Sequence, residues 1–166
     1  THPLDHPLTL ASLGWSNFFL SQLDEADLDL TPIRISGVHR ARIDGLSAEG
    51  PVTLPMTGTL TAGDLAIGDW VLSDGERIVR CLDRKTILTR LAAGTGNLVQ
   101  NIAANVDTLF IVTSCNQDFN VARLERYLTL ARQAEVTPVI VLTKPDLADD
   151  PESYAAQART LDQGLH

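Results

Sequence analysis

Two continuous apolar runs joined by an amphipathic segment constrain the fold of the last third of the chain. Residues 109–112 read Leu-Phe-Ile-Val and residues 139–142 read Val-Ile-Val-Leu. Unbroken apolar strands are typical of parallel sheets that are buried on both faces. Between the runs, side chains suited to one helix face recur at helical spacing, at Leu124, Tyr127, Leu128 and Ala131. The pattern predicts a β-α-β unit, and therefore an α/β fold in this region.

The predicted unit carries the start and stop signals of its helices. Asn120 is a suitable N-cap for the first helix, and Pro138 ends the crossover. Asp150, Pro151 and Glu152 have the N-cap, N1 and N2 chemistry of a second helix, which would run to about residue 161. Two strands and two helices bury little surface, so we expect this region to belong to a longer domain or to receive its remaining strands from elsewhere.

A polar loop follows the second apolar run, and it is the strongest candidate for a binding site. Thr143, Lys144, Pro145 and Asp146 come directly after the run. Open α/β sheets bind ligands outside the carboxyl ends of their strands. A carboxylate there can accept hydrogen bonds from both N1–H and the N2 amino group of guanine, and a lysine stem can cover the base. The tetrapeptide resembles the Asn/Thr-Lys-x-Asp base-recognition motif of GTPases. A solvated turn whose aspartate caps the next helix is the alternative.

The phosphate-binding half of a nucleotide site has no counterpart in this sequence. No GxxxxGK(S/T) segment occurs, and no lysine closely follows the glycines at Gly94 and Gly96. We interpret these glycines as part of a flexible connector. The chain as given lacks the lysine, the backbone cradle and the magnesium-binding hydroxyl that phosphoryl transfer needs.

Residues 33–91 show short strand-like runs separated by turn signals. The runs are residues 33–43, 52–55, 56–60, 70–72, 78–82 and 87–91. Asp74 and Gly75 form a typical hairpin turn signal between two of them. Five or so short strands over about 60 residues predict a small all-β barrel of OB or SH3-like type.

Basic residues gather on the first of these runs. If residues 33–43 form one strand, then Arg34, Arg40 and Arg42 share one face, while His39 lies on the apolar face and should be packed. Residues 31–100 contain eight bases and seven acids, whereas the preceding 30 residues contain five acids and no lysine or arginine. The middle segment is therefore the plausible place for an RNA contact, with a solvated strand face as the alternative.

Composition limits the setting in which the chain works. The net charge of −8 argues against a non-specific polyanion binder. No apolar run reaches the roughly 18 residues of a membrane span, so we expect no membrane partner. The two cysteines, Cys81 and Cys115, indicate neither a disulfide framework nor a zinc site, and they fit a reducing cytoplasm.

The order of barrel, connector and guanine-type motif resembles the circularly permuted GTPases that act on the small ribosomal subunit (RsgA/YjeQ-like). The segments that carry the resemblance are Leu13-Gly14-Trp15 and residues 68–71, 105–112, 118–120, 123–128 and 139–147. The resemblance implies an N-terminal arm at residues 1–30, an OB-fold barrel at 31–91, a linker at 92–104, and the first part of a permuted G domain at 105–166. The phosphate loop, the switch regions and a zinc-binding domain would follow beyond this chain.

The resemblance also implies roles for individual residues. Thr143, Lys144 and Asp146 would bind the nucleotide, with Asp146 reading the guanine edge and Lys144 packing on the base. Thr143 stands where most GTPases have Asn, which puts one contact to the base or to the phosphate loop in question. Arg34, Arg40 and Arg42 are the RNA-contact candidates, and no residue is assigned a catalytic or metal-binding role. The cofactors would be GTP or GDP with magnesium, and zinc only in the part beyond this chain.

The function that follows is maturation of the small (30S) ribosomal subunit by a cytoplasmic GTPase that binds 16S rRNA. The intact protein would hydrolyse GTP to GDP, whereas this chain alone should be inactive. A non-catalytic RNA-binding OB module with an attached interaction domain is the alternative. A degenerate G domain that serves as a protein-binding scaffold is a third possibility.

Overall fold

The computed structural model describes residues 7–58, 60–94, 96 and 98–163, and the chain divides into two compact units. The N-terminal unit is Thr1–Val106 and the C-terminal unit is Asp107–His166. We describe each unit separately. None of the helices in the described ranges is long and apolar enough to cross a membrane.

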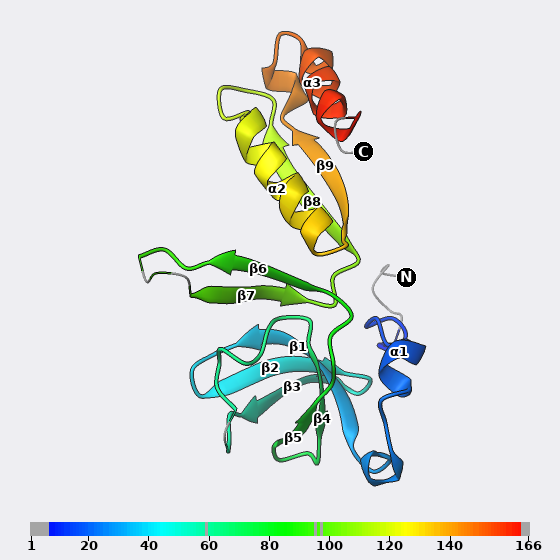
Figure 1. Ribbon diagram of the computed structural model, residues 1–166. Coiled ribbons are helices and arrows are strands. Elements are labelled where there is room, and N and C mark those ends of the chain that lie inside the picture. The colour runs from blue at the N-terminus through cyan, green and yellow to red at the C-terminus, as the bar shows by residue number, and fades with distance from the viewer. Residues whose placement is uncertain (1–6, 59, 95, 97, 164–166) are drawn as a thin grey trace. The chain divides into compact units, whose positions relative to one another are not determined.

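The N-terminal unit is built on a five-stranded sheet in which every neighbouring pair of strands is antiparallel (Figure 1). The sheet order is β3-β2-β1-β4-β5. In chain order the strands are β1 (Thr31–Val38), β2 (Arg42–Ser47), β3 (Gly50–Pro55), β4 (Trp70–Ser73) and β5 (Ile78–Cys81). The two outer strands, β3 and β5, form no ladder with each other in the described part of the chain, so no closed barrel is found.

Strand β4 is buried on both faces and joins two apolar clusters. Val71 packs into a cluster that also contains Ile33, Ile35, Ile43, Leu54, Leu65 and Ile78. Trp70 and Leu72 point to the opposite face, where they pack with Phe19 and Leu82. All four residues of β4 are buried, which explains why this short strand carries an unbroken apolar run.

The second cluster is covered by the N-terminal arm, which contains helix α1 (Asn17–Leu20) and the short 3-10 helix η1 (Glu25–Asp27). Apolar residues of the arm that pack on this cluster are Leu10, Leu13, Trp15, Leu23 and Leu30. The Trp15 ring meets the Trp70 ring edge-on, with centroids 4.9 Å apart. An ion pair between buried Asp27 and Arg80 fixes the far end of the arm. Residues 1–6 of the predicted arm lie outside the described residues.

Two expectations about the strands are wrong. Residues 33–43 are not one strand, because residues 39–41 turn the chain between β1 and β2 and the His39 N–H donates to the Arg42 carbonyl at 2.9 Å. Residues 56–58 are not a strand either, because β3 ends at Pro55. Thr59, within that predicted strand, is outside the described residues.

Residues 92–104 are not simply a linker. Strand β6 (Ile87–Leu91) pairs antiparallel with β7 (Val99–Ala104), so half of the expected linker is the second strand of a hairpin. Gly94 and Gly96 lie in its turn, and both have positive φ; Thr95 beside them is outside the described residues. The Ala104 N–H at the end of the hairpin donates to the Ile67 carbonyl at 2.7 Å. Next to it lies Gly68, at φ +93°, where a Cβ would collide with the Ala104 carbonyl oxygen.

The C-terminal unit has the predicted β-α-β order (Figure 1). Strands β8 (Thr108–Ser114) and β9 (Thr137–Thr143) are parallel neighbours, and helix α2 (Val121–Gln133) connects them. The Asn120 side chain accepts a hydrogen bond from the Arg123 N–H, which confirms it as the N-cap. The 3-10 helix η2 (Pro145–Leu147) and helix α3 (Pro151–Gln163) follow.

Helix α2 covers one face of the two-stranded sheet. Leu124 and Leu128 of the helix pack on Ile111 of β8, with Leu109, Phe119, Ile140 and Leu161 around them. Side chains alternate along a strand, so the other face presents Phe110 and Val112, which are 66% and 63% exposed. The continuous apolar run of β8 is therefore covered on one side only among the described residues.

Candidate functional site

The predicted base-recognition loop lies at the carboxyl end of β9, where an open α/β sheet presents ligand-binding loops. Thr143 is the last residue of β9, and Lys144 adopts a left-handed conformation with φ +54°. Such a backbone costs a residue other than glycine about 1–2 kcal/mol, and this cost is often found at functional sites. Asp146 then lies in the first turn of η2.

The loop backbone is held by hydrogen bonds, whereas its two ionic side chains are exposed. The Leu147 N–H donates to the Lys144 carbonyl at 3.1 Å, and the Cys115 N–H donates to the Thr143 carbonyl at 2.9 Å. Within the described residues, neither the Lys144 amine nor the Asp146 carboxylate has a hydrogen-bond or ion-pair partner. The loop thus presents a cation and a carboxylate whose bonding capacity is unused.

Helix capping does not explain Asp146. The residue that caps α3 is Asp150, whose Oδ1 accepts from the Ser153 N–H at 3.3 Å. Asp146 lies earlier, in η2, and its carboxylate accepts no backbone N–H among the described residues. The alternative interpretation, in which Asp146 serves as the N-cap of the next helix, therefore does not agree with the structure.

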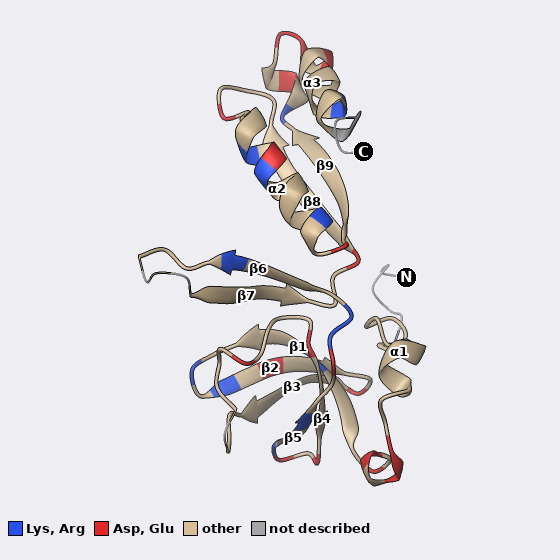
Figure 2. Cartoon of the chain, in the orientation of Figure 1, with Lys and Arg blue, Asp and Glu red and all other residues tan. Residues whose placement is uncertain are grey.

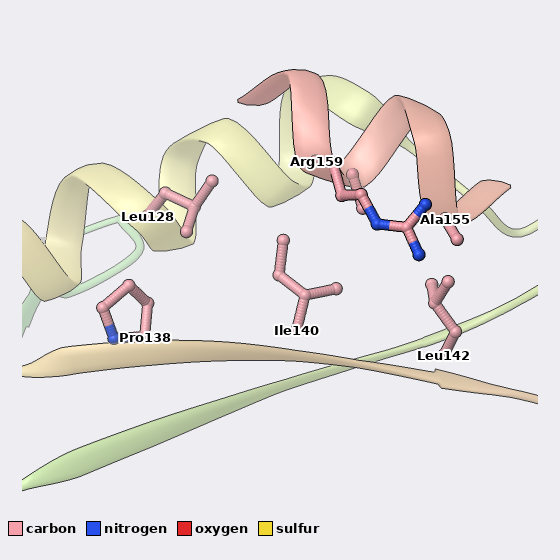
Figure 3. Close-up of a pocket in the computed structure, with 7 residues that line it drawn as sticks. Leu128, Pro138, Ile140, Leu142, Ala155 and Arg159 are labelled. Carbon is pink, nitrogen blue, oxygen red and sulfur yellow. The ribbon is translucent and has the colours of Figure 1, made fainter. Parts of the chain in front are cut away.

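Two depressions lie near the loop. A polar one of about 530 Å³ occupies the carboxyl end of the sheet, and it is lined by Cys115, Asn116, Gln117, Asp118, Leu147, Ala148, Asp149 and Tyr154. A more apolar one of about 290 Å³ lies between α2, β9 and α3, with Leu128, Ile140 and Leu142 among its lining residues (Figure 3). Neither is lined by Lys144 or Asp146.

The surface near the loop carries mainly negative charge. Acidic residues gather from η2 into the start of α3, at Asp146, Asp149, Asp150 and Glu152 (Figure 2). Lys144 is the basic residue of this segment. A polyphosphate would meet little positive charge here, which fits a segment that recognises a base rather than phosphates.

The three candidate RNA-binding arginines do not share one strand face. Arg34, on β1, directs its guanidinium inward: it donates to the carbonyls of Leu13 at 2.6 Å, Asn105 at 2.8 Å and Gly68 at 3.3 Å. It thereby ties the arm, the sheet and the end of β7 together. Arg40, in the β1–β2 turn, and Arg42, on β2, are exposed. The parity argument failed because the chain turns at residues 39–41.

An ionic cluster surrounds the β1–β2 turn. His39 is exposed rather than packed, and its Nε2 lies 2.8 Å from an Asp44 carboxylate oxygen. The other oxygen accepts from the Thr53 hydroxyl at 2.9 Å and lies 3.7 Å from Arg42 Nε. The His39 hydrogen bond, with a further contribution from Thr53, holds the pKa of Asp44 below its ordinary value. Asp44 thus offsets part of the positive charge at this turn.

The most buried ion pair of the N-terminal unit is structural. Fully buried Asp69 receives two hydrogen bonds of 2.7 Å from Arg84 and one of 2.8 Å from the Ala66 N–H. The paired carboxylate raises the pKa of Arg84. Nearby, burial first and then the Asp69 charge raise the pKa of the Cys81 thiol to about 11. These groups form a supporting network around β4 and β5.

The described residues contain no group of three or more His, Cys, Asp or Glu side chains that could hold a metal ion. Sequence reasoning also missed Ser114, whose hydroxyl lies 3.5 Å from that of Thr143. The available signal was positional: Ser114 ends one apolar strand as Thr143 ends the other, and equal ends meet in a parallel pair.

Comparison with known proteins gives consistent results. The family model of the RsgA GTPase matches residues 81–165. The small ribosomal subunit biogenesis GTPase RsgA of Mesorhizobium japonicum is 54% identical over 159 residues, which cover 95% of this chain and 46% of that protein. RsgA 2 of Vibrio parahaemolyticus is 44% identical over 155 residues, covering 92% of this chain and 43% of that protein.

Solved structures share the fold. YjeQ from Thermotoga maritima matches with a TM-score of 0.57 at 21% identity, over 82% of this chain and 50% of that one. YloQ, a circularly permuted GTPase, matches with a TM-score of 0.56 at 20% identity, over 85% of this chain and 50% of that one. The chain spans about half the length of the curated relatives it matches. With a family model that matches half of its residues, this chain belongs to the RsgA GTPase family.

Proposed function

We propose that the protein containing this chain is a GTPase that binds GTP and GDP, hydrolyses GTP to GDP, and acts in maturation of the small ribosomal subunit. The observation that carries this proposal is the loop at the end of β9, in which Lys144 and Asp146 are exposed and lack partners among the described residues. The names of the relatives, which state a role in small ribosomal subunit biogenesis, support this setting, and the cytoplasm is the location we propose.

In this proposal the loop supplies base recognition. The Asp146 carboxylate accepts from N1–H and the N2 amino group of guanine, and the Lys144 stem covers the base. Thr143 fixes the start of the loop. Magnesium, when bound with nucleotide, would neutralise phosphate charge. No described residue of this chain is assigned to magnesium or to zinc, and the phosphate contacts would come from the rest of the full-length protein.

The N-terminal unit is proposed as an OB-type module that contacts 16S rRNA. Its five antiparallel strands have the strand number of that fold, and a β3–β5 contact would be needed to close the barrel. Exposed Arg40 and Arg42 at the β1–β2 turn are the proposed phosphate contacts. Arg34 is left out, because its guanidinium already donates to three carbonyls within the unit.

The test is GTP turnover by the full-length protein, measured with and without small ribosomal subunits. We expect magnesium-dependent release of phosphate that small subunits accelerate, and no turnover by the 166-residue chain alone. Absence of turnover together with salt-sensitive RNA binding would favour a non-catalytic RNA-binding module. Turnover by the 166-residue chain itself would contradict the proposed division of the site.

A further inference from the structure

Three contacts from the end of β8 hold a single residue, Thr143, at the end of β9. The Thr143 hydroxyl donates to the Thr113 carbonyl oxygen at 3.3 Å and lies 3.5 Å from the Ser114 hydroxyl. The Thr143 carbonyl accepts from the Cys115 N–H at 2.9 Å. The residue before Lys144 is therefore fixed through both its side chain and its backbone.

The strand register explains the pairing of the two hydroxyls. Ser114 and Thr143 are the last pair of the parallel ladder, and they lie on the sheet face opposite α2. A threonine hydroxyl has one proton, and both the Thr113 carbonyl and the Ser114 hydroxyl are within reach as acceptors of it. Whichever of the two accepts that proton, the Thr143 hydroxyl is engaged by the end of β8.

We propose that Ser114 is a positioning residue for nucleotide binding, whose hydroxyl acts through Thr143 to fix the loop that presents Lys144 and Asp146. This inference rests on the proposed function, because it takes that loop to recognise guanine. Ser114 itself does not touch the base. Its contribution is to hold the root of a loop whose next residue is in the left-handed region, at φ +54°.

The expected loss of nucleotide affinity follows from the strength of one hydrogen bond. A neutral hydrogen bond contributes about 1 kcal/mol, which corresponds to about a fivefold change in affinity. A loop that is loosened at its root must be ordered when nucleotide binds, and that ordering weakens binding. The loss should therefore appear in nucleotide affinity and in base selectivity.

The experiment measures dissociation constants for GDP and IDP with variants of the full-length protein. IDP lacks the N2 amino group, so its binding depends less on Asp146. We expect Ser114→Ala to weaken GDP about fivefold and IDP less. Ser114→Thr, which keeps a hydroxyl, should stay within about twofold of the wild type. In a Thr143→Val background, Ser114→Ala should have no further effect, because the pair is already broken.

Matched controls lie at the other end of the same ladder. Thr108 pairs with Thr137 on the same sheet face as Ser114 and Thr143, and both are exposed. Thr137→Val makes the same change as Thr143→Val, and Thr108→Ala removes a hydroxyl together with a methyl group, each on the same strand as its counterpart but at the end away from the loop. Both should bind GDP within about twofold of the wild type.

The outcomes separate the two proposals. If Ser114→Ala binds GDP within about twofold of the wild type while Asp146→Asn loses its preference for guanine, the positioning role is wrong and the proposed function stands. A loss in Ser114→Ala that Thr108→Ala shares would also overturn the role, since it would reflect general weakening of the strands. If Asp146→Asn keeps its guanine preference, the proposed function fails and the positioning role fails with it.

Discussion

Strands β4 and β8 both carry continuous apolar runs, yet they are buried differently. Every residue of β4 is buried, because one apolar cluster lies on each face of its sheet. In β8, Ile111 is 5% exposed beneath α2, whereas Phe110 next to it is 66% exposed. An unbroken apolar run is thus compatible with burial of both faces of a strand. Whether both faces are buried depends on the segments that pack against the strand.

The N-terminal unit should respond most strongly to a cavity at β4. Trp70 is fully buried and contacts both Trp15 and Phe19, so Trp70→Ala should destabilise this unit by about 3–5 kcal/mol. Chemical denaturation followed by Trp15 fluorescence measures the loss. A change in the free energy of unfolding below about 1 kcal/mol would show that packing of the arm on Trp70 contributes little to the stability of this unit.

A cavity beneath α2 should reduce the stability of the C-terminal unit by somewhat less than Trp70→Ala reduces that of the N-terminal unit. Leu124 is 1% exposed and packs on Ile111, so Leu124→Ala should cost about 2–4 kcal/mol. Circular dichroism at a helical wavelength follows this unit, because α2 and α3 are its main helices. The tryptophan signal should stay unchanged, since both tryptophans lie in the N-terminal unit. A parallel loss of tryptophan signal would mean that the two units unfold together.

The open face of β8 should tolerate a polar residue. Phe110→Ser should change the stability of the isolated chain by less than about 0.5 kcal/mol, because the side chain is mostly exposed. The matched buried change is Ile111→Ser, which should unfold the C-terminal unit. Equal losses for the two variants, measured by urea denaturation, would show that the face is covered in solution.

A further predicted effect concerns pH and Cys81. The pKa of this thiol is raised from 9.0 to about 11 in the folded unit, mainly by burial. Its stabilising contribution is therefore complete below about pH 9 and is lost as the pH rises toward 11. Urea midpoints of the N-terminal unit should fall over this window, and Cys81→Ala should flatten the fall. If Cys81→Ala leaves the fall of the urea midpoint with pH unchanged, that fall comes from the titration of other groups.

Local patterns predicted much of the C-terminal unit. Asn120, Asp150 and the helical spacing around Leu124 act within a few residues of one another, so their consequences can be inferred from nearby sequence. The position of the Thr143–Asp146 loop follows from the strand before it. The contacts of that loop with Ser114 and Cys115 required the strand register, which the sequence indicated only indirectly.

Long-range pairing accounts for what the sequence did not predict. Arg34 looked like a surface residue by strand parity, but its guanidinium reaches the carbonyl of Asn105, 71 residues away. Strand β7 includes the polar residues Gln100 and Asn101 and follows a glycine-containing segment, so its pairing with β6 was not evident from the sequence. The turn at residues 39–41 depends on a hydrogen bond across the hairpin rather than on a glycine or proline signal.

The central claim is that Asp146 reads guanine, and base selectivity tests it most directly. Xanthine has a carbonyl where guanine has the N2 amino group, so an amide at this position should favour xanthine. In the full-length protein, Asp146→Asn should reduce the preference for GDP over XDP by at least about tenfold, with Asp149→Asn as the neighbouring control. An unchanged ratio of GDP to XDP affinity in Asp146→Asn would contradict the account.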